Sequence, residues 1–143
     1  DSFISGETPH WTLLKRLECT TSEVLTYRLR SGDLLINRVN SLPYLGKVAY
    51  IDEAIAGAVF ESNLMRFSIS NQAEPRYVAY ALSRDDVHVQ IEQRAKLAVH
   101  QASINQADVS QLLIPLPPLS LQQEFADFAA EADKSQFSAA PPI

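Results

Sequence analysis

The sequence contains little cysteine and little glycine, and both shortages exclude classes of site. Cys19 is the single cysteine among 143 residues, so no disulfide forms within the chain and no Cys/His spacing typical of zinc occurs. Only four glycines are present, and no two lie close enough for a glycine-rich phosphate-binding loop. Such sparing use of cysteine is typical of a reducing compartment, so we expect a cytoplasmic protein.

Long apolar runs and an excess of basic residues are missing as well. No run approaches the ~18 apolar residues of a membrane span, and no signal-peptide pattern occurs. The 12 Lys and Arg against 17 Asp and Glu give a net charge of −5, which does not favour nucleic-acid binding. The charge is uneven, however, because residues 28–47 carry +3 and residues 108–143 carry −4. The middle of the chain can therefore still face phosphate.

No pattern of a catalytic or metal site is present. The histidines lie far apart, without the spacing of metal ligands: His10, His88 and His100. The carboxylates Asp85, Asp86 and Glu92 are better explained by a helix start than by a metal-dependent nuclease. The two prolines of segment 116–119 lack the preceding amide or carboxylate of an adenine methyltransferase motif. We therefore predict no catalytic residue, no metal and no cofactor, and a nuclease ranks a distant third among the possible functions.

The apolar pattern predicts one α+β domain in which helices pack on a twisted mixed or antiparallel sheet. Short apolar runs predict strands at 34–36, 47–51, 58–60 and 64–69. Alternation in the last of these places Met65, Phe67 and Ile69 on the core face. Helical spacing then predicts a helix from Pro75, a second capped by Asp85 and Asp86 that reaches Lys96, and a short turn led by Asn105 or Gln106. Between the last two, residues 99–106 are expected to form a polar linker.

The C-terminal segment predicts a helix that docks on another surface. Three prolines exclude a helix over 112–119, whereas the capping-box pattern of Ser120 and Gln123 predicts one over 121–135. Its apolar side chains form one stripe against an acidic back: Leu121, Phe125, Phe128, Ala129 and Ala132. The stripe needs a partner, either the domain's own sheet or another helix. Residues 138–143 are expected to be disordered.

The loop after the first strand is the most informative segment for binding. Its polar side chains offer donors suited to phosphate or base edges, a ring that can stack, and a point charge: Arg38, Asn40, Ser41, Tyr44 and Lys47. Asn, Ser, Pro and Gly are also the residues that any turn uses, so a binding role and a structural role both stay open.

The segment 96–105 is a second candidate for binding. Lys96 and Gln101 bring a cation and an amide to what we expect to be a helix end followed by a loop. Ser103 or Asn105 can equally serve as the cap of the next turn.

Several motifs, in order, resemble a known family. Residues 32–41, 44–47 and 61–66 look like successive motifs of the target-recognition domain in specificity subunits of type I restriction–modification enzymes. Residues 101–105 and 114–123 are similar to the end of that domain, where a Pro-Pro-Leu segment leads into a long helix. Residues 1–30 match poorly, and nothing is inferred from them.

The resemblance implies a non-catalytic DNA-binding role. Such a domain reads one half of a bipartite sequence in double-stranded DNA, while separate modification subunits methylate adenine and restriction subunits translocate and cut. It implies a recognition domain over 1–119, the start of a spacer or dimerisation helix over 120–137, and a short tail. Because a full specificity subunit has two such domains, we expect a fragment, or a half-size relative that pairs with its own copy. The alternative is a protein-interaction module that docks through the last helix without touching DNA.

Overall fold

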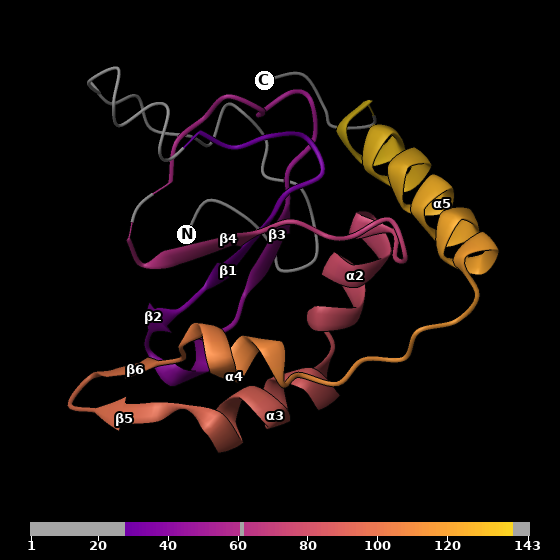
Figure 1. Cartoon of the computed structure of the whole chain (residues 1–143). Coiled ribbons are helices and arrows are strands. Elements are labelled where there is room, and N and C mark those ends of the chain that lie inside the picture. Colours follow the sequence, from indigo (N-terminus) through magenta and orange to yellow (C-terminus); the bar gives the residue numbers. More distant parts are fainter. Residues whose placement is uncertain (1–27, 61, 139–143) are drawn as a thin grey trace.

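A computed structural model describes residues 28–60 and 62–138, which form two small antiparallel sheets with helices around them (Figure 1). The predictions about Cys19, His10 and the poorly matched N-terminal segment lie outside these residues. The elements are β1 (Leu34–Asn37), β2 (Val39–Asn40), the 3-10 helix η2 (Leu42–Tyr44), β3 (Val48–Tyr50), β4 (Leu64–Phe67), α2 (Pro75–Leu82), α3 (Asp85–Arg94), β5 (Lys96–Ala98), β6 (Gln101–Ser103), α4 (Gln106–Ser110) and α5 (Leu119–Ser138). The α+β prediction is confirmed.

The first sheet, which we call the core sheet, has the order β3-β1-β4. All four residues of β1 are buried, because both of its faces are covered. Leu34 and Ile36 belong to an apolar cluster that includes residues of α2 and α3, whereas Leu35 belongs to a cluster with Ala49 and Ile51. Successive residues of a strand point to opposite faces, so a short apolar run without alternation is what a doubly covered strand requires.

The other strands of the core sheet follow the prediction in part. Met65, Phe67 and Ile69 all pack against the larger cluster, as their alternation indicated. The expected strand at 58–60 is wrong, since the structure has only one isolated bridge there, between Arg28 and Val59. The chain turns at Gly57, which has a φ of 96°, and this leaves too short a straight segment for a strand.

The second sheet, the exposed sheet, has the order β2-β6-β5. Arg38 alone separates β1 from β2, so the chain passes directly from the core sheet to the exposed one. The expected polar linker over 99–106 is wrong in its first part, because β5 and β6 form a hairpin there. Only Ala102 of these two strands is buried, so the hairpin has no apolar alternation from which a strand is predicted.

The helices of the second half are close to the predicted ones. Val87 and Ile91 are the buried residues of α3. Asp85 and Asp86 do not cap this helix, because its N-cap is Arg84. They lie in the first turn instead, where their negative charges interact favourably with the helix dipole. The helix ends at Arg94, so Lys96 opens β5 and is not a helical residue. Asn105 is the N-cap of α4 and forms a complete capping box. The prediction gave either Asn105 or Gln106 as the start of this turn, and the first of the two is confirmed.

Helix α5 begins earlier than predicted and packs beside α2 (Figure 1). The amides of Leu121 and Gln122 donate to the carbonyl of Pro118, at 2.9 and 3.2 Å, so Ser120 lies inside the helix and is not its cap. Pro118 brings a fixed φ to the entry of the helix, which explains the early start. In the described part of the chain, no helix is long and apolar enough to cross a membrane.

Candidate nucleic-acid interface

Two predicted binding segments, far apart in sequence, meet in the exposed sheet. Strand β2 pairs with β6, with Val39 opposite Ser103 and Asn40 opposite Ala102. Strand β5 pairs with β6, with Lys96 opposite Ser103 and Ala98 opposite Gln101. The polar residues after β1 and those around the hairpin therefore belong to one small sheet, which neither segment indicates alone.

The charge of the two segments that form the exposed sheet differs from that of the whole chain. The strands of the exposed sheet come from two stretches without Asp or Glu, residues 34–51 and 93–107, each with a net charge of +2. The chain as a whole has a charge of −5. Two positively charged segments that meet in an otherwise acidic protein are suited to a polyanionic partner, because cations close to phosphate release condensed counterions.

Arg38 is held firmly at the junction of the two sheets. Its amide donates to the carbonyl of Asn63 at 2.9 Å, and its carbonyl accepts from the amide of Ile104 at 3.0 Å. Its Nε donates to the carbonyl of Ser62 at 2.7 Å. Within the described ranges the terminal guanidinium nitrogens of Arg38 make no hydrogen bond, so a positioned fork of donors remains for a ligand.

Asn40 and Ser41 have local roles that sequence reasoning left open. The Oδ1 of Asn40 accepts from the amide of Ser41 at 2.7 Å and from its hydroxyl at 3.5 Å. This oxygen therefore shapes the turn into η2, while the amide nitrogen of Asn40 has no bond to any described residue.

Tyr44 and Lys47 lie beside a cavity of about 290 Å³ whose lining also includes Arg84 and His88. Tyr44 is 55% exposed. Partial burial lowers the pKa of Lys47 from its ordinary value, because desolvation disfavours the ammonium form. Gly46 sets this geometry, since its φ is 81° and a side chain at this position would collide with Ile91.

The tip of the hairpin contains exposed residues that lie inside the predicted segment 96–105 but were not singled out as contacts. Leu97 is 68% exposed and Val99 83% exposed, and His100 has a φ of 72°. Val99 and His100 are the two residues between β5 and β6. Nothing in the sequence set them apart within that segment, because a positive φ at a residue other than glycine leaves no mark in a composition or a spacing.

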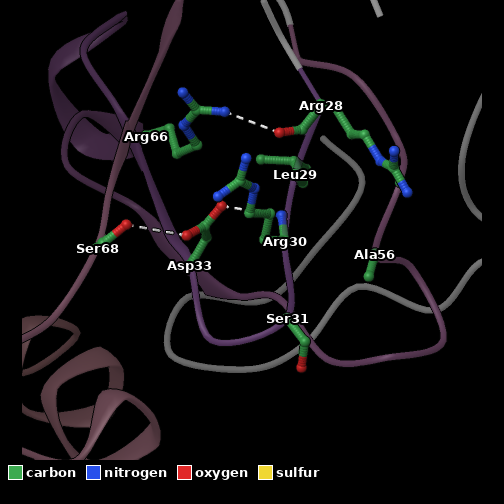
Figure 2. A pocket seen from close by; sticks show the side chains of 9 residues that line it. Arg28, Leu29, Arg30, Ser31, Asp33, Ala56, Arg66 and Ser68 are labelled. Atoms are coloured by element: carbon green, nitrogen blue, oxygen red, sulfur yellow. Dashed lines mark hydrogen bonds between the residues drawn. The ribbon is translucent and has the colours of Figure 1, made fainter. Parts of the chain in front are cut away.

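The arginines of the positive stretch do not form one surface. Arg28 and Arg30 line a separate pocket of about 630 Å³ before β1, together with Arg66 of β4 (Figure 2). Arg66 donates to the carbonyl of Arg28 at 2.8 Å, while the side chain of Arg28 extends towards Ala56 on the other side. Arg38 and Lys47 lie beyond the opposite end of β1. The stretch 28–47 is therefore split by the core sheet.

Asp33 gives this pocket a structural character. The buried carboxylate accepts from the amide of Arg30 at 2.9 Å and from the hydroxyl of Ser68 at 3.1 Å (Figure 2). It thus joins the turn before β1 to the end of β4 and satisfies the donors at that corner. The part of the chain that the structure describes holds no group of three or more His, Cys, Asp or Glu able to bind a metal.

Comparison with known proteins places the chain in a family. The family model for the type I restriction modification DNA specificity domain matches residues 19–138. The chain belongs to this family. The resemblance predicted from the sequence motifs is thereby confirmed, and the match includes both sheets and all of α5.

Two relatives illustrate the kinship. The MjaX type I restriction enzyme specificity subunit of Methanocaldococcus jannaschii is 35% identical over 112 residues, which cover 78% of this chain and 26% of that protein. The EcoKI type I restriction enzyme specificity subunit of Escherichia coli K12 is 26% identical over 113 residues, which cover 78% of this chain and 24% of that protein. The chain thus spans about a quarter of the length of these relatives.

The last helix of the specificity domain uses its predicted apolar stripe unevenly. Phe125 packs against Tyr77 and Tyr80 of α2, with ring centroids 5.9 and 4.6 Å apart. Leu121 and Phe128 are 52% and 72% exposed. Ala129 is half-buried and Ala132 is exposed, so the stripe is shared between α2 and solvent.

A buried amide that sequence reasoning missed holds α5 in place. Gln122, which is 1% exposed, donates to the carbonyl of Pro117 at 2.7 Å and accepts from the amide of Glu74 at 2.9 Å. These two bonds join the start of α5 to the start of α2. They therefore fix which side of α5 faces α2 and which side faces solvent.

Proposed function

We propose that the chain is a DNA target-recognition domain that reads one half of a bipartite sequence through its exposed sheet. One observation carries the proposal: two acid-free, cationic segments more than 40 residues apart converge in a single small sheet of a specificity-family domain. In such a sheet, contacts to the phosphate backbone of the DNA set the position on the duplex, and contacts to the bases set the sequence that is read.

The residues divide between these two tasks by their chemistry. Arg38 and Lys96 supply charge for phosphate oxygens, and Lys47 adds to this charge from the neighbouring loop. Asn40 and Gln101 supply amides, the groups that pair with adenine edges in the major groove, at about 1–3 kcal/mol of discrimination for each good pair. Tyr44 offers an exposed ring that packs against sugar or base. The residues form an interface with double-stranded DNA and need no cofactor.

The proposed domain has no catalytic task of its own. It directs a separate methyltransferase subunit and a separate restriction subunit to the bound sequence, in a cytoplasmic complex. Both relatives have names that describe specificity subunits of type I restriction enzymes, which supports this division of labour. The exposed side of α5 then joins the domain to a second recognition domain or to a second copy.

A salt titration with paired arginine variants tests the proposal. The chain, assembled with its modification subunit, is used first to select bound sequences from a random duplex pool. Affinity for the selected duplex should fall steeply with salt, and Arg38→Gln should reduce the slope by about one. Arg28→Gln is the matched control, because it removes the same charge at the other end of β1. Failure to select any sequence, or equal effects of the two variants, would refute the proposal.

The second candidate is a protein-interaction module that docks through α5 and does not contact DNA. The exposed Leu121 and Phe128 favour it, because apolar side chains on an outer helix face are what a partner helix covers. Phe128→Asp separates the two functions, since this side chain does not pack on α2 as Phe125 does. Loss of complex assembly with unchanged DNA affinity places the two activities on different faces.

A further inference from the structure

We propose that the tip of the β5–β6 hairpin, formed by Leu97, Val99 and His100, enters a groove of the DNA and determines the base preference there. This inference rests on the proposed function and deepens it, because it names the element that penetrates the duplex. None of these three residues was a predicted contact. Lys96 and Gln101, which were predicted as contacts, flank the tip.

The first argument is exposure without a structural reason. Leu97 and Val99 are among the most exposed large apolar residues, and neither belongs to an apolar cluster of the domain. The hairpin extends away from α2 and α5, and all three residues of β5 are exposed (Figure 1). Apolar area left in water is unfavourable, so its position on a projecting tip indicates a surface that is covered in a complex.

The second argument is backbone strain at the tip. His100 is the one described residue other than glycine with a positive φ, at 72°. Glycine or asparagine adopts this conformation at little cost, whereas a histidine does so against the steric preference of its Cβ. The turn therefore holds an imidazole where glycine would relieve the strain. An imidazole both donates and accepts hydrogen bonds, which suits it to base edges.

The third argument is fit and charge. The major groove of B-DNA is about 12 Å wide and admits a two-stranded β-ribbon, whose strands lie about 4.8 Å apart. The hairpin lies wholly within the acid-free stretch 93–107, so it brings no carboxylate of its own to phosphate. Arg94 and Lys96 lie at its base, one at the end of α3 and one at the start of β5. Apolar tip residues then meet thymine methyl groups while the cations stay at the backbone.

The alternative occupant of this surface is another protein strand. Strand β5 is an edge strand of its sheet, and edge strands with exposed apolar residues also pair with other chains. Charge favours DNA, because the two stretches that supply this sheet, 34–51 and 93–107, each have a net charge of +2 in a protein whose net charge is −5. The experiment separates the two occupants.

The test uses the complex with the modification subunit and compares matched variants. Val99→Ala and the double variant V99A/H100G alter the tip, while Val89→Ala truncates an exposed valine on α3 as the control. Selection from a random duplex pool reads out base preference, and a melting curve reads out folding. We expect the double variant to relax the preference at one or two adjacent base pairs and to weaken binding of the preferred duplex about tenfold. Non-specific binding and melting temperature should not fall, since glycine suits the turn.

The outcomes distinguish this inference from the proposed function. If the wild-type complex selects a sequence and the tip variants select the same one with equal affinity, the inference is wrong and the proposed function stands. If the wild-type complex selects nothing, the proposed function itself fails. If the tip variants no longer assemble with the modification subunit, the hairpin contacts protein and the inference is overturned.

Discussion

The two sheets have the same number of strands and connect through one residue, yet they differ in their burial and in their packing. Each has three antiparallel strands. In the core sheet β1 is buried on both faces, whereas in the exposed sheet every residue of β5 is open to solvent. The core sheet is therefore constrained by packing, and the exposed sheet can change its side chains at little cost in stability. Such a division suits a domain that keeps one fold and reads different sequences.

The largest effect on stability is expected from truncating a side chain in β1. Ile36→Ala removes a fully buried side chain from the main apolar cluster. Lost burial together with the cavity left behind should lower the free energy of unfolding by about 2–5 kcal/mol. Urea denaturation monitored by circular dichroism measures the loss. A change below about 1 kcal/mol would show that the core sheet is not the stability centre that its burial indicates.

A pair of glycine variants tests how tightly the loop between the sheets is packed. Gly46→Ala introduces a Cβ at a φ of 81° that collides with Ile91, whereas Gly57→Ala introduces one at a φ of 96° with nothing nearby. Strain alone costs about 1–2 kcal/mol, so Gly57→Ala should lose that much and Gly46→Ala about 2–4 kcal/mol. Thermal unfolding of the two variants measures the difference. Equal losses would mean that Ile91 moves aside freely.

Asp33→Asn tests whether the arginine-lined pocket is structural. The carboxylate accepts two hydrogen bonds that join the turn before β1 to β4, and asparagine retains one acceptor oxygen for them. We expect a loss of about 1–2 kcal/mol in the free energy of unfolding, with DNA affinity unchanged. Asp52→Asn is a control, because among the described residues that carboxylate bonds only within its own turn, to the amide of Ala54. A selective loss of DNA affinity in Asp33→Asn would make the pocket part of the interface.

The core sheet was predictable because burial leaves a signature in the sequence. The runs at 34–36 and 64–69 correspond to β1 and β4, and the helical spacing after Pro75 corresponds to α2. These patterns arise because each element buries an apolar face. The start of α5 was misplaced because Ser120 and Gln123 match a capping box, whereas Pro118 opens the helix in the structure.

The exposed sheet was not predictable, because strands that bury little apolar surface leave no such pattern in the sequence. Ala102 is the only fully buried residue of strands β2, β5 and β6, so no apolar periodicity marks them. Residue chemistry did single out Arg38, Asn40, Lys96 and Gln101 as binding candidates. Their convergence depends on the pairing of β2 with β6, a contact between distant segments that local patterns do not contain. The strained turn at His100 left no signal at all.

The smallest expected effect on stability is the one that sharpens the comparison most. Leu97→Ala removes a side chain that already lies in water, so the free energy of unfolding should change by no more than about 0.5 kcal/mol. Leu113→Ala is the matched control, since Leu113 is also well exposed, at 77% against 68% for Leu97, but lies outside both sheets. If the exposed sheet is free of packing constraints because it serves DNA, only Leu97→Ala should alter the selected base sequence. A stability loss in Leu97→Ala comparable to that of Ile36→Ala would instead mean that packing constrains both sheets. The side chains of the hairpin would then not be free to vary with the sequence that is read.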